Sequence, residues 1–263
     1  MERIHIVGAS RSGTTLMHEL MTTCFNIDGA TKEEVRLWRY GDFTHSICCT
    51  KCPGDEILAF PLLYFDKNLY FIYMLRDPRD VIASFHGRAR DEYWTNLRAW
   101  RESAAIMRRL KGHRRFVSVR YEDLVARADA VQKMLQERLP FLELKLPFSE
   151  YHQHAAPSGA YATAMRGVRP ISSGNVGAWR RHRPRLVAQM NLHGPLADEL
   201  IEFGFESDRS WLADLAGVEP DPAPSRTPER YPRGKRFRKA VRRWLHVIVY
   251  MVRRWRPRRR AVA

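Results

Sequence analysis

Residues 8–15 have the sequence Gly-Ala-Ser-Arg-Ser-Gly-Thr-Thr (GASRSGTT). They follow a run rich in β-branched residues at 3–7 (RIHIV) and precede an apolar stretch at 16–21 (LMHELM), so we expect a strand, a glycine-bounded turn and a helix. This is the layout of a loop that holds phosphate groups. Nucleotide triphosphatases have a lysine before the last hydroxyl residue of that loop, whereas this chain has Thr14 there. The loop therefore suits a single phosphate, with no obvious need for a metal ion.

Hydrogen-bond donors are dense in this loop. Arg11 adds a fixed positive charge and a planar fork that suits phosphate oxygens, and several hydroxyl groups lie beside it. The expected phosphate-binding residues are Ser10, Arg11, Ser12, Gly13, Thr14 and Thr15. The alternative is a strand-to-helix turn that binds nothing.

The charge of the chain is concentrated at one end. Residues 226–263 contain 15 Lys and Arg and one acidic residue, a net charge of +14, whereas the other 225 residues carry only +2. The 263 residues suffice for one α/β domain with a sizeable core. The first expected strand begins within three residues of Met1, and no apolar run approaches the ~18 residues needed to span a bilayer, so we expect neither a signal peptide nor a transmembrane helix.

The four cysteines make a poor disulfide framework, because Cys48, Cys49 and Cys52 crowd into five residues and only Cys24 lies apart. This usage indicates a reducing compartment, and we expect a cytoplasmic protein. A zinc site would need a fourth ligand, for which His45 is the nearest candidate. We favour a buried strand in which the cysteines act as small apolar residues, and we expect no metal site.

The order of the remaining elements predicts an α/β fold. Strand-like runs occur at 3–7, 46–50, 69–75 and 115–120, and helical patterns lie between them, notably at 80–89 and 95–110. This alternation predicts a three-layer α/β/α domain of the P-loop type with a central parallel sheet, in which ligands bind at the carboxyl ends of the strands. Residues 183–216 are expected to be helices that complete a domain spanning 1–218. A Pro-rich linker (219–234) and a basic amphipathic tail (235–263), expected to contain a helix, follow.

A second anion site is predicted after the strand at 69–75. Arg76 emerges at the carboxyl end of this strand, and Ser84 and Arg88 are spaced to share one face of the following helix. The alternative is a helix-capping network of Arg76, Asp77, Arg79 and Asp80. Two anion sites, neither of which has an acidic metal ligand, indicate a nucleotide with phosphates at two ribose positions.

The segment GASRSGTTL (8–16) followed by LRDPRDVIASF (75–85) resembles the sulfotransferase family, over about residues 3–182. In that family the first loop holds the 5′-phosphosulfate of 3′-phosphoadenosine 5′-phosphosulfate (PAPS), and the Arg–Ser pair holds its 3′-phosphate. The resemblance implies that PAPS is the co-substrate, that adenosine 3′,5′-bisphosphate (PAP) is a product, and that a hydroxyl group on a glycan, a lipid-linked molecule or a tyrosine is the acceptor.

Two further segments resemble the same family. VRYEDLV (119–125) matches the segment whose tyrosine packs beside adenine, which implies this role for Tyr121, although a strand-to-helix junction capped by Asp123 is an alternative. SSGNVGAW (172–179) resembles a late loop with the pattern R-K-G-x-x-G-D-W. Ser172 and Ser173 stand where that loop has its basic pair, so the resemblance implies phosphate binding by Ser173 and Gly174 without the charge.

The loop resembles tyrosylprotein and carbohydrate sulfotransferases more closely than the cytosolic small-molecule group, because it has Arg11. KEEVR (32–36) resembles the segment that supplies a glutamate base in the tyrosylprotein enzymes, which implies that Glu34, or else Glu33, takes the acceptor proton. CTKCP (49–53) resembles a segment whose lysine lies near the bridging oxygen, which implies this role for Lys51. The expected catalytic residues are Glu34, Arg11 and Lys51; the alternatives are a solvated charged segment and an exposed lysine at a strand end.

The tail suits a membrane surface. Its central apolar stretch, Trp244–Val252, is too short to span a bilayer but can lie in the interface, and arginines flank it. We favour peripheral attachment to anionic lipid; the alternatives are a helix that docks on the domain and binding to nucleic acid or another acidic polymer. If the loop were only structural, the chain would be a non-catalytic basic binding protein. If it held a triphosphate, the chain would be a P-loop small-molecule kinase, for which Asp77 is the only weak magnesium ligand.

The sequence also indicates where an acceptor would bind. We expect the acceptor pocket to be formed by residues 94–100, by the loop at 151–167 with His152 and His154, and by the loop around Trp38. The acceptor itself is not encoded in any pattern that we recognise.

Overall fold

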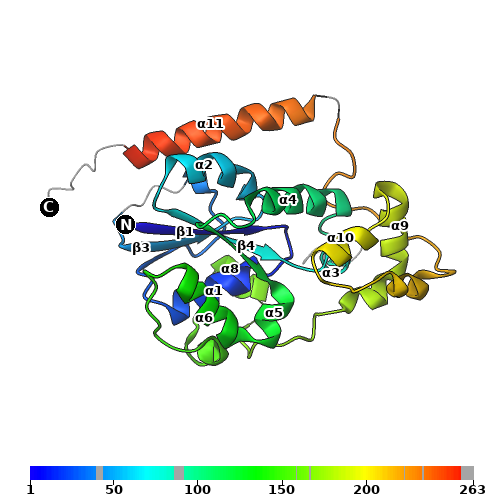
Figure 1. Ribbon diagram of the computed structural model, residues 1–263, viewed down its shortest axis with the longest axis horizontal. Helices are drawn as coiled ribbons and strands as arrows, with labels where there is room; N and C mark the ends of the chain where they lie inside the picture. The colour runs from blue at the N-terminus through cyan, green and yellow to red at the C-terminus, as the bar shows by residue number, and fades with distance from the viewer. Residues whose placement is uncertain are drawn as a thin grey trace.

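The computed structural model describes residues 1–39, 44–85, 92–157, 159–165, 167–221, 223–232 and 234–255. A five-stranded parallel sheet forms its centre (Figure 1). The strands are β1 (Glu2–Gly8), β2 (Gly29–Ala30), β3 (Ile47–Lys51), β4 (Leu69–Leu75) and β5 (Phe116–Arg120), arranged in the order β2-β3-β1-β4-β5. Pairing is parallel throughout, with Ile6 opposite Lys51 on one side and Ile72 on the other. The four predicted strands are confirmed; β2 has only two residues and was not predicted.

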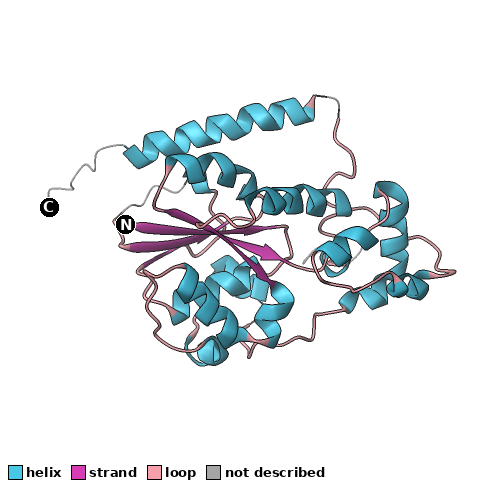
Figure 2. Cartoon of the chain, in the orientation of Figure 1, coloured by secondary structure: helices cyan, strands magenta, loops and turns pink. Residues whose placement is uncertain are grey.

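Helices cover both faces of the sheet (Figure 2). One layer contains α1 (Thr14–Cys24), α5 (Tyr121–Ala126), α6 (Ala128–Arg138), α7 (Tyr151–His154) and α8 (Gly159–Met165). The other contains α2 (Ala59–Phe65), α3 (Pro78–Ile82), α4 (Leu97–Leu110), α9 (Arg183–His193), α10 (Ala197–Glu202) and α11 (Lys235–Trp255). Short 3-10 turns are η1 (Leu37–Arg39), η2 (Asp55–Leu58), η3 (Phe148–Glu150), η4 (Ala178–His182) and η5 (Ser210–Leu215). The predicted three-layer α/β/α fold is confirmed.

The pleat of the central strand divides the core into two parts. Ile4 and Ile6 of β1 face the layer that contains α1, whereas Val7 faces the opposite layer. Because β1 is covered on both faces, nearly all of its side chains are buried. The two cores hold the sheet rigid, so that the loops at the carboxyl ends of the strands have a fixed frame.

The helix predicted at 80–89 is shorter than expected. Asp77 caps its start by accepting a hydrogen bond from the Arg79 backbone N–H (2.8 Å), and Pro78 occupies the first helical position. The helix ends at Ile82, because the chain then turns and the Ser84 carbonyl accepts from the Trp94 N–H (2.8 Å). Ser84 is therefore not on a helix, which corrects the prediction that it shares a helical face with Arg88; Arg88 itself lies outside the described residues.

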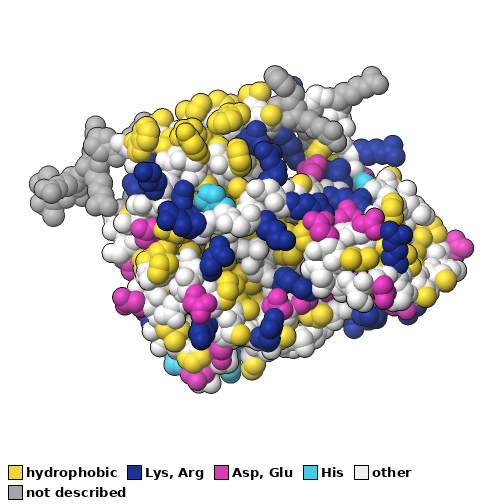
Figure 3. Space-filling model, viewed as in Figure 1, with side chains coloured by type: hydrophobic (Ala, Val, Ile, Leu, Met, Phe, Trp, Pro, Cys, Tyr) yellow, Lys and Arg dark blue, Asp and Glu magenta, His cyan; other side chains and the backbone are white. Residues whose placement is uncertain are grey.

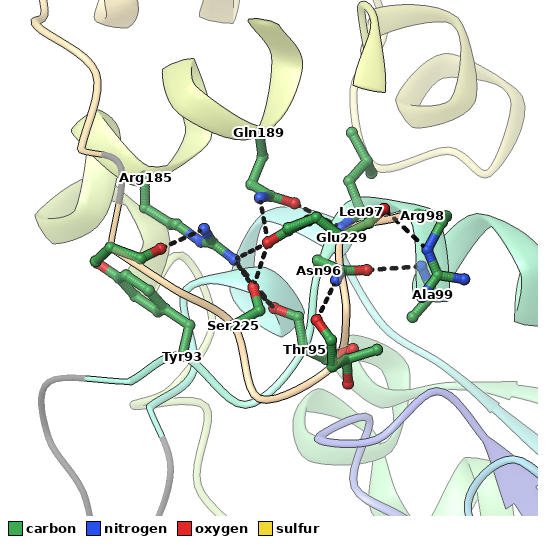
Figure 4. A network of polar contacts seen from close by, with 12 residues as sticks. Tyr93, Thr95, Asn96, Leu97, Arg98, Ala99, Arg185, Gln189, Ser225 and Glu229 are labelled. Atoms are coloured by element: carbon green, nitrogen blue, oxygen red, sulfur yellow. Dashed lines mark hydrogen bonds and ion pairs between the residues drawn. The ribbon is translucent and has the colours of Figure 1, made fainter. Parts of the chain in front are cut away.

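The segment predicted as a linker is bonded to the domain (Figure 4). The Tyr93 N–H donates to the Pro224 carbonyl (3.1 Å), and the Arg226 N–H donates to the Tyr93 carbonyl (2.9 Å). The buried Arg185 of α9 donates to the Ala223 carbonyl (3.1 Å) and lies 3.6 Å from the Glu229 carboxylate. Residues 223–229 therefore form a strap across the domain that leads to α11.

The helix of the tail packs against η1, η2 and α2. Its own residues Val247 and Tyr250 are buried on the face that meets the domain, and the Tyr250 hydroxyl donates to Asp66 Oδ2 (2.7 Å). The His246 ring stacks on the Trp38 ring with 4.3 Å between centroids. The alternative expectation, a helix that docks on the domain, is therefore confirmed, and Trp38 supports the tail rather than an acceptor pocket.

Candidate active site

The first loop is shaped by two glycines, Gly8 and Gly13, and by one strained residue, Arg11. Arg11 has φ 74°, a left-handed conformation that side chains rarely adopt. Gly13 has φ 93°, and a Cβ atom there would lie 2.6 Å from the Tyr121 ring, so only glycine fits. Because Gly13 has no side chain to cap α1, the first N–H groups of this helix are open to an anion from outside.

The loop borders a cavity of about 550 Å³ at the carboxyl ends of β1, β4 and β5. This volume lies within the range that is usual for small-molecule sites. Of the predicted residues, the lining includes Ser10, Arg11, Gly13, Thr14, Thr15, Glu34, Arg76, Tyr121 and Gly174. It does not include Ser12, whose buried hydroxyl donates to the Ala9 carbonyl (2.6 Å), so Ser12 shapes the loop from behind.

Of the second predicted anion motif, Arg76 lines this cavity and lies against the first loop, whereas Ser84 does not line it. One Nη atom of Arg76 donates to the Arg11 carbonyl (3.0 Å), and the other donates to the Asn175 carbonyl (2.8 Å). Its guanidinium lies 4.3 Å from the centre of the Tyr121 ring, and its buried Nε has no hydrogen-bond acceptor among the residues that the structure describes. Arg11 in turn donates from Nε to Ser84 Oγ (2.9 Å). The arrangement joins the two predicted sites into one positively charged wall.

A second set of charges holds this wall in place. Arg79 contacts both oxygens of Asp77 and lies between the rings of Trp179 and Trp211, at 4.4 and 4.9 Å. Asp77 is therefore occupied as a helix cap and an ion-pair partner, not as a magnesium ligand. The alternative capping network is correct for Asp77 and Arg79. Arg76 lies 3.9 Å from Asp80 Oδ2 and also lines the cavity.

Asp80 positions the late loop. Its two carboxylate oxygens accept from the backbone N–H groups of Gly177 and Trp179, each at 2.9 Å. Burial and the nearby Asp77 raise the pKa of Asp80, against these hydrogen bonds and Arg76, which lower it. Asp80 thus holds the loop at 172–179, which resembles the family's late loop, against the start of α3, the helix that follows β4.

The cavity side of this loop differs in detail from the prediction. Ser172 and Gly174 line the cavity, but Ser173 does not. Ser172 Oγ accepts from the Gly174 N–H (3.2 Å). Arg169 also lines the cavity, and sequence reasoning missed it because it lies three residues before the segment that resembles the family loop. Arg169 therefore offers a positive charge close to the position where the basic pair is absent.

Glu34 stands at the cavity with a buried partner. Lys51 Nζ lies 2.5 Å from Glu34 Oε1, and the Lys51 side chain is only 1% exposed whereas that of Glu34 is 53% exposed. Burial lowers the pKa of Lys51, although the carboxylate of Glu34 acts in the opposite direction. Lys51 does not line the cavity and is covered by the Tyr161 ring, 4.8 Å from Nζ, so it is not an exposed strand-end lysine. Of the two candidate bases, Glu34 lines the cavity and Glu33 does not.

Part of the region expected to bind the acceptor lines this cavity. Trp94, Tyr151, Ala164, Met165 and Gly167 line the same cavity. His152 and His154 do not line it, and Trp38 lies against α11. The lining of the cavity therefore combines cationic side chains and backbone donors with aromatic and apolar side chains.

The cysteines show no sign of a metal site. None of the four forms a disulfide and all are buried, and burial raises the pKa of Cys52 to about 12. Within the described residues, no three or more His, Cys, Asp or Glu side chains are grouped so that they could hold a metal ion.

No protein-family model and no curated protein matches this chain. Among solved structures, the sulfotransferase domain from the curacin biosynthetic pathway has a TM-score of 0.51 and 16% identity, covering 68% of this chain and 90% of its own. The sulfotransferase domain from the Synechococcus PCC 7002 olefin synthase has 0.47 and 17%, covering 68% and 87%. Retinol dehydratase in complex with androsterone and PAP has 0.42 and 14%, covering 88% and 82%. The likeness to the curacin domain, with the parallel sheet and phosphate-type loop, shows that this chain has the sulfotransferase fold.

Proposed function

We propose that this chain transfers a sulfuryl group from PAPS to a hydroxyl acceptor. One observation carries the proposal: a single cavity brings Arg11, Arg76 and the open start of α1 together with Glu34. Among the described residues that line this cavity, Glu34 is the only carboxylate. Such a site suits a dense anion and one general base, and it lacks the pair of acidic ligands typical of magnesium–triphosphate sites.

The residues of the cavity divide between the two ends of the nucleotide. We assign the 5′-phosphosulfate to Arg11, to the hydroxyls of Ser10, Thr14 and Thr15, and to the N–H groups at the start of α1. The 3′-phosphate is assigned to Arg76, whose buried Nε has no hydrogen-bond acceptor among the described residues, and to the loop at Gly174. Ser84, which does not line the cavity but accepts from Arg11, is assigned to the same end of the nucleotide. Tyr121 supports Arg76 with its ring face and offers its remaining edge to adenine.

The chemistry then needs three actions from the protein. Glu34 accepts the acceptor's hydroxyl proton as the new oxygen–sulfur bond forms, a general-base role that contributes about 10²–10⁴-fold. The bond between sulfur and the bridging phosphate oxygen breaks, and the electron pair stays on that oxygen of PAP. Arg11 and the N–H groups of α1 stabilise this charge, and such preorganised donors contribute about 2.7–4 kcal/mol each. In this mechanism the cations come from side chains, and no step passes through a metal ion.

Lys51 has a different part from the one that the resemblance implies. Its Nζ contacts Glu34 Oε1 and does not reach the cavity wall, so we assign Lys51 to holding the carboxylate in position. The buried ammonium fixes the direction of Glu34, whose other oxygen is left for the acceptor.

The test is the binding of PAP in the presence of EDTA, measured by isothermal titration calorimetry. Wild-type protein should bind PAP without a divalent cation, and Arg76→Ala should weaken binding by about 10- to 100-fold, because a charge-assisted contact to phosphate is lost. Arg108→Ala is the matched control, because this arginine pairs with Glu202 on the surface and does not line the cavity.

Two results would contradict the proposal. One is tight ATP binding that depends on magnesium, which would indicate a kinase. The other is PAP binding without transfer of radiolabelled sulfate from PAPS to any lipid, glycan or peptide fraction of a cell extract, which would leave a nucleotide-binding protein that is not an enzyme.

A further inference from the structure

The long helix α11 has an apolar face that the domain does not cover. Its inward face buries Val247 and Tyr250. An outward stripe repeats at helical spacing and is between 44% and 73% exposed; it consists of Val241, Trp244, Leu245, Ile248, Val252 and Trp255. A helix on the surface of a domain normally turns polar residues to solvent. Packing against the domain therefore explains the inward face of α11 but not the outward stripe.

The stripe continues onto the domain. Four further exposed apolar side chains belong to η2 and α2, namely Ile57, Phe60, Tyr64 and Phe65. Phe60 and Trp244 line one shallow groove of about 110 Å³, so the two groups adjoin. We call these ten side chains the apolar ridge; in the described part of the chain, fourteen large hydrophobic side chains are exposed, and ten belong to it. Figure 3 shows hydrophobic side chains gathered along the edge where Figure 1 draws α11.

Positive charge accompanies the ridge. α11 contains eight Lys and Arg and no acidic residue, and four more arginines follow in 256–263. Arg238, Arg242 and Arg253 are exposed. A second copy of the chain on this face would bring two such helices together and oppose like charges. An anionic surface would neutralise them, so the charge selects between two partners that could both cover an apolar face.

We propose that the apolar ridge docks the whole domain on an anionic lipid bilayer, with α11 lying in the interface. At 21 residues α11 is about 31 Å long, and its pattern of basic and bulky apolar residues is that of interfacial helices. No helix among the described residues is long and apolar enough to cross a membrane. Because η2 and α2 add to the ridge, the domain itself touches the bilayer, and the tail is not a tether.

This docking fixes the orientation of the domain relative to the bilayer. Tyr250 bonds α11 to Asp66, at the end of α2, so the helix cannot turn independently while it stays docked. α11 lies over α2 on one face of the sheet and runs along the direction of the strands (Figure 1), so the strands lie along the bilayer and their carboxyl ends, where the cavity lies, do not point into it. The docking itself does not depend on the proposed sulfuryl transfer.

The experiment is vesicle flotation with the full chain. Vesicles of phosphatidylcholine mixed with phosphatidylglycerol should float the wild-type protein, pure phosphatidylcholine should float far less, and added salt should weaken binding. Trp244→Ser/Ile248→Ser should reduce binding by about tenfold or more, and Phe60→Ser/Tyr64→Ser should also reduce it. Both pairs remove apolar area that the bilayer would bury.

The matched control is Leu192→Ser/Ile201→Ser, which removes two apolar side chains that are 39% exposed and lie outside the ridge. Circular dichroism and thermal unfolding check that each variant is folded. Equal binding by wild type and Trp244→Ser/Ile248→Ser would overturn the proposal. Normal binding by Phe60→Ser/Tyr64→Ser would contradict the part assigned to α2. A dimer in light scattering that Ile248→Ser dissociates, with no vesicle binding, would show that a second copy covers the ridge instead.

Discussion

Arginines serve two regions of this molecule in different ways. In the cavity, Arg76 is held by two backbone carbonyls and an aromatic ring, and Arg11 is held by Ser84. On α11, Arg238 and Arg242 are exposed, on a helix without a single acidic residue. A small anion needs donors that are fixed before it arrives, because fixed donors lose no entropy on binding. A charged surface needs only a density of charge, which flexible side chains supply.

The comparison teaches how to recognise the two kinds of basic region. The fixed arginines come from a domain part whose net charge is only +2, whereas the tail carries +14. The total charge of the chain therefore does not indicate an anion site in the cavity, whereas the geometry of Arg11 and Arg76 does. Single substitutions should show the same contrast: large, specific effects at the cavity and small effects on stability at the tail.

The largest effect is expected for Glu34→Gln. The amide keeps the size of the side chain but cannot accept the acceptor's proton, so kcat should fall by about 10²–10⁴-fold. Affinity for PAP, measured by calorimetry, should change little, because Glu34 is assigned to the acceptor. Glu33→Gln is the control, since Glu33 does not line the cavity, and it should remain near wild-type activity. Equal activity of the two variants would refute Glu34 as the base.

The next effect concerns the rigidity of the loop. Gly13→Ala should destabilise the fold by about 1–2 kcal/mol for the left-handed backbone, and by a further ~1–3 kcal/mol because its Cβ would meet the Tyr121 ring at 2.6 Å. Gly112→Ala is a matched control: φ is 86° there, and a Cβ would meet nothing within 4 Å. Chemical denaturation measures both. If the two variants lost equal stability, the close contact with Tyr121 would not restrict the loop.

Much of this rigid region could be predicted from the sequence. The strands at β1, β3, β4 and β5 were predictable because each is a short, largely apolar run in which most side chains are buried. Their carboxyl ends meet at one edge of a parallel sheet, so Arg11 and Arg76 were expected at the same edge, each binding one phosphate of the same nucleotide. Gly13 could be predicted as a loop residue, but not as one held by the ring of Tyr121, which lies more than a hundred residues along the chain.

What could not be predicted depends on contacts between distant residues. The pairing of Lys51 with Glu34 is set by how the segment before η1 folds back over β3. Arg169 has no motif of its own and reaches the cavity through the path of a loop. The end of α3 at Ile82 is set by a hydrogen bond from Trp94 to Ser84, which helical spacing cannot show. The outward stripe of α11 is visible as a pattern, but only packing reveals which face is left open.

A smaller effect is expected where the tail meets the domain. Tyr250→Phe keeps the buried ring but removes the hydroxyl that donates to Asp66 (2.7 Å), so the free energy of unfolding should fall by about 1 kcal/mol. Affinity for PAP should not change, because Tyr250 does not line the cavity. Tyr64→Phe is the control on the exposed ridge, where the side chain is 83% exposed, and it should change stability by less than about 0.5 kcal/mol. A loss of PAP affinity in Tyr250→Phe would mean that the two regions are coupled.

The smallest effect should be a dependence of tail docking on pH. Burial lowers the pKa of His246, and the arginines at 36, 242 and 39 act in the same direction against Asp55. A lowered pKa means that the docked state favours the neutral ring. The neutral His246 ring contributes its full stabilisation above its ordinary pKa near 6.5, and this stabilisation is lost as the pH falls through the lower pKa of the folded state. The stability of wild type should therefore decline between about pH 7 and about pH 5 more than that of His246→Phe, which keeps the ring on Trp38 but cannot be protonated. His154→Phe, at an exposed site, is the control. If the stabilities of wild type and His246→Phe fell in parallel with pH, the titration of His246 would not be what loosens the tail, and acid would act on the domain as a whole.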